Sequence, residues 1–159
     1  MYGTASRLVE LLKERGLTCA TAESCTGGGV ASAITDVPGA SAVFWGGIVS
    51  YDNSVKEHVL GVPQSVLSRH GAVSPECAAA MATGARRLMK TDMAVSLTGI
   101  AGPDGGSADK PVGLVWFGLS TEHGVRTEKA VFGGARADIR RSAVLHALEM
   151  LTAAASMRT

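Results

Sequence analysis

Residues 21–35, TAESCTGGGVASAIT, join a short strand-like stretch to a helical pattern through three consecutive glycines. We predict a strand over residues 17–23 and a helix that begins within the glycines. Ser24 or Thr26 is the expected cap for the free amides of its first turn. The order of strand, glycine turn and helix is the first unit of an alternating pattern that continues along the chain.

The remaining segments alternate in the same way. Apolar residues at helical spacing, followed by a glycine, predict a first helix. The segment Ser74-Pro75-Glu76 combines a cap, a proline and an acid, which is typical of a helix start. Helices are predicted over residues 4–15, 75–90 and 137–155. Strands are predicted over residues 42–51, 92–98, 112–120 and 125–132. We expect the strand over 42–51 to be buried and the last two strands to form a hairpin around 122–124. This order predicts a single domain, 1–159, with a three-layer α/β/α fold around a mixed central sheet.

Composition excludes several classes of protein. The 159 residues are 46% hydrophobic and 18% charged, as expected of a globular domain. Fifteen Lys and Arg balance fourteen Asp and Glu to a net charge of +1, and no basic run is present. Nucleic acid is therefore not an expected partner. No stretch of about 18 apolar residues could span a bilayer, and the amino terminus does not have the pattern of a signal peptide. We expect a cytoplasmic protein.

Cysteine and histidine positions do not predict a metal site. The three cysteines are an odd number without CxxC spacing, so reduced thiols are expected. No pair of histidines has the i, i+4 spacing of a zinc motif. We therefore expect that the protein binds no metal ion and no cofactor through its cysteines and histidines, which are Cys19, Cys25, Cys77, His58, His70, His123 and His146.

The segment TAESCTGGG, 21–29, allows two interpretations. In one, the glycines form a tight turn and the hydroxyl residues only cap a helix. In the other, a nucleophile stands at a helix start, where free amides could bind an oxyanion or a phosphate. The segment matches neither GxSxG nor SxxK, since Gly27 is three residues after Ser24. A general base would have to come from another segment.

SYDNSVKEH, 50–58, is the candidate source of that base. Tyr51 and Lys56 follow a predicted strand whose end should face the same rim as the glycine turn. The alternative is an ordinary polar loop and helix start. Lysine acts as a base only where burial or a nearby cation lowers its pKa.

Two further segments could bind an anion. SLTGIAGPDGGSADKPVG, 96–113, is either a simple crossover or a nest of backbone amides, and it does not contain the P-loop pattern. FGGARADIRR, 132–141, places Arg136 and Arg140 on one helix face. This pair is either a solvated basic patch or a phosphate site.

Together these segments resemble one family. TAESCTGG, VSYDNSVK, HGAVSPE, SLTGIAGPDGGSADKPVGLVWFG and FGGARADIRRSA are similar to motifs of the C-terminal domain of the CinA competence/damage-inducible family, over about residues 5–155. Stand-alone members of that family are nicotinamide-nucleotide amidases. The resemblance therefore implies hydrolysis of the carboxamide of nicotinamide mononucleotide, which gives nicotinate mononucleotide and ammonia in NAD recycling.

The resemblance also implies roles for particular residues. Ser24 would be the nucleophile and Lys56 its base, with Tyr51 and Thr98 supporting the pair. Arg136 and Arg140 would bind the 5′-phosphate. The remaining oxyanion or substrate-binding residues would be Cys25, Thr26, Gly27, Gly28 and Gly102.

Two alternatives remain open at this point. A cysteine hydrolase could use Cys25, although no histidine lies in a recognisable activating motif. A non-catalytic nucleotide-binding or interaction module could share the same fold. We expect a small-molecule mononucleotide as the partner, no nucleic acid, no membrane, and a homo-oligomer, most simply a dimer.

Overall fold

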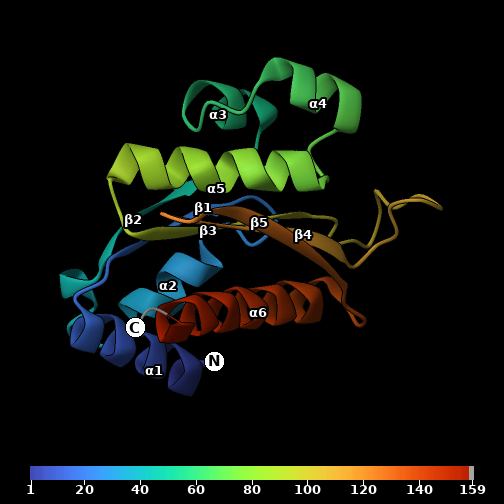
Figure 1. Ribbon diagram of the computed structural model, residues 1–159. Coiled ribbons are helices and arrows are strands. Elements are labelled where there is room, and N and C mark those ends of the chain that lie inside the picture. The colour runs from blue at the N-terminus through green and yellow to red at the C-terminus, as the bar shows by residue number, and fades with distance from the viewer. Residues whose placement is uncertain (158–159) are drawn as a thin grey trace.

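A computed structural model describes residues 1–157 of the chain, which adopt an α/β fold (Figure 1). Its elements follow the alternation that the sequence predicts. In chain order they are α1 (Tyr2–Arg15), β1 (Cys19–Glu23), α2 (Gly29–Thr35), a 3-10 turn η1 (Ala40–Ala42), β2 (Phe44–Val49), α3 (Asn53–His58), α4 (Gln64–His70), α5 (Pro75–Met89), β3 (Met93–Gly99), β4 (Leu114–Thr121), β5 (Gly124–Val131) and α6 (Arg136–Met157).

The central sheet is mixed, as predicted. Its five strands in the described chain run in the order β2-β1-β3-β4-β5. β1 is parallel to both β2 and β3, whereas β3, β4 and β5 are joined by antiparallel pairing. The carboxyl ends of β1, β2 and β3 therefore lie at one edge, which is where open α/β sheets usually bind ligands.

Helices cover both faces of this sheet and make the predicted three layers. α3, α4 and α5 lie over one face, and α1, α2 and α6 lie over the other (Figure 1). The larger apolar cluster joins the sheet to α1, α2 and α6, and a smaller cluster lies beneath α5. Every residue of β1 is buried, so this strand runs through the centre of the domain.

Local signals in the sequence define several helix ends. α1 ends at Gly16, whose φ of 63° is a left-handed conformation that glycine adopts without strain. The hydroxyl of Ser74 accepts a hydrogen bond from the amide of Cys77 and caps α5. The chain turns at residues 122–123 between β4 and β5, which confirms the predicted hairpin.

The strand predicted over residues 42–51 is present as β2, but the prediction that it is buried was wrong. β2 occupies an edge of the sheet, and its residues alternate between half-buried and exposed. Trp45 is 57% exposed and Val49 is 50% exposed. An apolar run of this length does not distinguish an edge strand from a central one, because strand order depends on pairing with distant segments.

A helix that crosses a bilayer must be long and predominantly apolar. None of the helices within residues 1–157 meets this requirement.

Candidate active site

Ser24 lies at the carboxyl end of the central strand β1. It is the first residue after the strand, and it begins the turn of residues 24–28 that leads into α2. Its amide donates a hydrogen bond to the carbonyl of Leu97 on β3, at 3.0 Å. Glu23 pairs with Val49 at the end of parallel strand β2, so the segment after β2 runs beside Ser24. Ser24 itself is half-buried and remains accessible from the rim of the sheet.

Lys56 reaches this rim from α3. Asp52 begins that helix by accepting a hydrogen bond from the amide of Ser54, and Lys56 follows in the first turn with 1% of its surface exposed. Its Nζ lies 3.1 Å from Oγ of Ser24. The structure therefore brings together the two residues for which the sequence predicted catalytic roles.

Two backbone carbonyls complete the surroundings of the lysine. Nζ of Lys56 donates to the carbonyl of Ser50 at 2.6 Å and to that of Tyr51 at 3.1 Å. A neutral amine has two N–H donors and one lone pair, which matches two carbonyls and one hydroxyl. A protonated amine has three donors, and all three contacts can accept them. The lysine can therefore gain or release a proton without moving.

Burial favours the neutral form of this lysine. The low-dielectric surroundings lower the pKa of Lys56 below its ordinary value, because a charged amine loses solvation there. Negative charge on Cys77, Asp52 or Cys25 would act in the opposite direction, with a smaller effect. A buried lysine with a lowered pKa, beside a hydroxyl, is the arrangement that a serine nucleophile requires.

Cys25 is a poor candidate for the nucleophile. Its side chain is buried, and desolvation raises the pKa of the thiol to about 11. The reactive form of cysteine is the thiolate, which is scarce at neutral pH when the pKa is that high. This environment argues against a cysteine hydrolase.

Glu23, which the sequence analysis did not select, caps α2. Its Oε2 accepts hydrogen bonds from the amides of Gly28 and Val30, and its Oε1 accepts one from Ala31. The predicted cap by Ser24 or Thr26 was wrong: the helix has no side-chain cap at Gly28, and the hydroxyl of Thr26 donates to Glu23 at 2.6 Å. An acid just before a glycine-rich helix start is the signal that could have identified this role.

The capping carboxylate decides which amides of the turn remain available. Gly27 donates its N–H to the carbonyl of Ser24, and Gly28 donates to Glu23. Among residues 1–157, the amides of Cys25 and Thr26 donate to no other residue. The amide of Cys25 contacts only its own thiol, so Thr26 carries the one amide of residues 25–28 without an acceptor in the described chain.

Tyr51 and Thr98 take positions that differ from a simple supporting role. Tyr51 contacts Lys56 through its backbone carbonyl, whereas its ring is exposed and its hydroxyl accepts a hydrogen bond from Arg136. The hydroxyl of Thr98 is buried and donates to the carbonyl of Ala72 at 2.8 Å, rather than to Ser24 or Lys56.

The two predicted phosphate ligands contact different loops. Arg136 is exposed, and it donates to the carbonyl of Gly102 and to the hydroxyl of Tyr51. Arg140 donates instead to the carbonyls of Cys25 and Thr26, within the turn that follows Ser24. Both arginines lie at the rim, but only Arg136 projects to the exposed surface.

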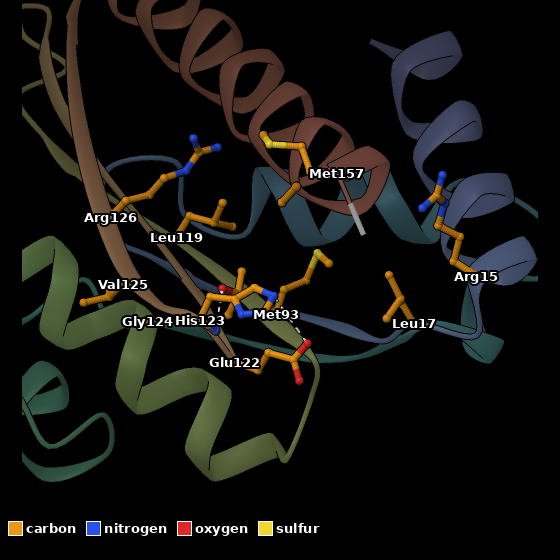
Figure 2. A pocket seen from close by; sticks show the side chains of 12 residues that line it. Arg15, Leu17, Met93, Leu119, Glu122, His123, Gly124, Val125, Arg126 and Met157 are labelled. Atoms are coloured by element: carbon orange, nitrogen blue, oxygen red, sulfur yellow. Dashed lines mark hydrogen bonds and ion pairs between the residues drawn. The ribbon is translucent and has the colours of Figure 1, made fainter. Parts of the chain in front are cut away.

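A separate hollow of about 960 Å³ lies at the opposite end of the sheet (Figure 2). Its lining includes Leu17, Met93 at the start of β3, Thr121 at the end of β4, and Met157. None of the residues predicted to form the site lines it. As for metals, no group of three His, Cys, Asp or Glu side chains in the described part of the chain is placed to hold an ion.

The same segments match a known family. Residues 2–155 match the family described as the CinA C-terminal domain. The chain belongs to this family. A CinA-like protein of Geotalea uraniireducens is 49% identical over 144 residues, which are 91% of this chain and 34% of that protein. The chain thus spans about a third of the length of such curated relatives of the CinA family.

Relatives of similar length are also known. The nicotinamide-nucleotide amidohydrolase PncC of Escherichia coli is 50% identical over 143 residues, covering 89% of this chain and 87% of that protein. The crystal structure of competence/damage inducible protein CihA from Agrobacterium tumefaciens has 44% identity and a TM-score of 0.93, and the match covers 96% of this chain and 93% of that one. The fold of this chain is therefore that of CinA-family proteins.

Proposed function

We propose that the protein hydrolyses the carboxamide of nicotinamide mononucleotide to nicotinate mononucleotide and ammonia, with Ser24 as nucleophile and Lys56 as base. One observation carries the proposal: Nζ of the buried Lys56 lies 3.1 Å from Oγ of Ser24. The activity named for the Escherichia coli relative supports the choice of substrate.

The first half of the reaction forms an ester on the enzyme. Ser24 Oγ attacks the amide carbon as neutral Lys56 takes its proton, and a tetrahedral intermediate forms. The intermediate then collapses, the C–N bond breaks, and the proton held by Lys56 passes to the leaving ammonia. The amides of Thr26 and Cys25, which donate to no other described residue, are the donors that would stabilise the oxyanion.

The second half releases nicotinate mononucleotide. Lys56, neutral again, takes a proton from water as the water oxygen attacks the ester carbon. When the ester C–O bond breaks, the proton returns to Ser24 Oγ. Because the contacts of Lys56 suit both of its protonation states, neither half requires the side chain to move.

Arg136 is our proposed ligand for the 5′-phosphate. It is exposed at the rim, and its contacts with Gly102 and Tyr51 occupy only two of the five N–H donors of a guanidinium. The remaining donors can form charge-assisted hydrogen bonds to phosphate oxygens.

The proposal is tested by measuring ammonia released from nicotinamide mononucleotide by the purified protein, with and without a chelator. We expect release that is insensitive to chelation and absent in Ser24→Ala. No ammonia above the blank, with folded wild-type protein and saturating substrate, would favour a non-catalytic nucleotide-binding module instead. Loss of activity on chelation would contradict the metal-independent mechanism.

A further inference from the structure

We propose that Arg140 is a positioning residue of the oxyanion site rather than a phosphate ligand. Its guanidinium binds two carbonyls of the turn after Ser24 and thereby orients the N–H of Thr26 for the reaction. This inference rests on the proposed function, because it assigns a part in the same hydrolysis.

Arg140 is held where it can act on this turn. It lies near the start of α6, beside Ile139, which is 2% exposed and anchors the helix in the core. From there Nε donates to the carbonyl of Cys25 at 3.2 Å, and Nη2 donates to the carbonyl of Thr26 at 3.0 Å. One edge of the guanidinium, of the kind that binds phosphate in a bidentate manner, is thus occupied by backbone oxygens.

Planar trans peptides transmit this contact to the neighbouring N–H groups. In a trans peptide the N–H points opposite to the carbonyl, so a carbonyl held by Arg140 fixes the direction of the next N–H. The N–H of Gly27 is already bound to the carbonyl of Ser24. The N–H of Thr26 has no acceptor among residues 1–157, and it points away from the guanidinium. Arg140 therefore orients one unused donor close to the nucleophile.

Glu23 holds the same turn from its inner side. The hydroxyl of Thr26 donates to the buried carboxylate of Glu23, while the carbonyl of Thr26 is held by Arg140. Thr26 is fixed through its side chain and its carbonyl, and only its N–H remains uncommitted. Because Glu23 also occupies the first amides of α2, the start of that helix is not open to the substrate phosphate.

The two roles for Arg140 predict different kinetics. A phosphate ligand acts on the nucleotide alone, so its loss raises KM for the nucleotide and leaves the riboside unaffected. A residue that positions an oxyanion donor acts on the transition state of any carboxamide substrate, so its loss lowers kcat for both. Loss of one oxyanion donor lowers kcat by about 100-fold or more.

The test compares Arg140→Ala and Arg140→Lys with Arg141→Ala, which removes an adjacent arginine whose described ion pair is a surface contact with Asp138. We expect kcat to fall by about 100-fold in Arg140→Ala for nucleotide and riboside alike. Added guanidinium ion should restore part of that loss, and Arg141→Ala should behave as wild type. An unchanged kcat, or a loss confined to the nucleotide, would overturn the proposal.

A second readout does not depend on amidase activity. We expect the amide resonance of Thr26 to shift in Arg140→Ala, because the carbonyl of the same peptide loses its guanidinium partner, with no change in Arg141→Ala. An unchanged Thr26 amide in a folded variant would overturn the positioning role even if the enzyme is active. If the wild type releases no ammonia but Thr26 responds as expected, the proposed function fails while the hold of Arg140 on the turn stands.

Discussion

Basic side chains lie both at the carboxyl end of β1 and at the opposite end of the sheet, but the two groups differ in burial and in hydrogen bonding. At the first, the Nζ of Lys56 is buried and has contacts with a hydroxyl and two carbonyls. At the second, the exposed side chains of Arg15 and Arg126 border the hollow of Figure 2, and their guanidinium groups donate no hydrogen bond to another described residue. We therefore base the candidate site on fixed, desolvated groups rather than on the size of a cavity.

The most severe test of this difference is removal of the nucleophile. Ser24→Ala should lower kcat/KM for nicotinamide mononucleotide by about 10,000-fold or more, because loss of a covalent nucleophile removes the whole acylation pathway. Ammonia release measures the effect, and an unchanged melting temperature serves as the control for folding. A variant that keeps a tenth of wild-type activity would place the reaction elsewhere.

Replacing Lys56 should have the next largest effect. Lys56→Ala removes the base, and Lys56→Arg introduces a guanidinium that cannot accept a proton near neutral pH. Both should lose activity by about 1,000-fold, the range expected for general base catalysis. Substantial activity in Lys56→Arg alone would show that the residue supplies only positive charge.

The pH dependence follows from the lowered pKa of Lys56. The neutral amine is the active form, so activity is present above the lowered pKa and is lost as pH falls through it. We expect kcat/KM to rise about tenfold for each pH unit on the acid side and then to level off below the pKa of a free lysine, about 10.4. A profile that declines as pH rises toward this value would contradict the assignment.

Removal of the neighbouring thiol should matter much less. Cys25→Ala keeps the backbone N–H of residue 25 and removes a buried thiol with a raised pKa. We expect less than about a tenfold loss of kcat/KM, since the change only leaves a small packing defect beside Ser24. If Cys25→Ala were more damaging than Ser24→Ala, the thiol would be the nucleophile.

Substitution at the hollow should have the smallest effect. Arg126→Ala and Arg15→Ala remove exposed side chains at the far end of the sheet, and we expect kcat/KM within about twofold of wild type, as for surface changes in general. The measurement is the same ammonia assay. A large loss in either variant would break the contrast between the two ends and link the hollow to the reaction.

Features that depend on nearby residues were predictable from the sequence. The stop of α1 at Gly16, the cap of α5 by Ser74 and the hairpin at residues 122–123 are all determined within a few positions of the chain. The same applies to Ser24, whose place between a strand and a glycine turn is visible in the motif itself. Local hydrogen bonds and backbone preferences decide such features.

Features that depend on distant segments were not predictable from the sequence. The edge position of β2 follows from its pairing with β1, and a strand's own residues do not reveal its neighbours. Glu23 is a different case, because the amides that it caps belong to Gly28, Val30 and Ala31, which are close to it in the chain. An acid before a glycine-rich helix start is a local signal for this role.

The sequence by itself determined the alternating α/β order, the strand-to-helix turn that carries Ser24, and the presence of Lys56 in a separate segment. Only the tertiary structure decided that Lys56 is buried against Ser24, and that Arg140, 115 residues from Cys25, contacts the turn rather than the open rim. The physical reason is that the pKa of an amine and the freedom of an amide depend on all surrounding groups. Those groups are brought together only when the chain packs.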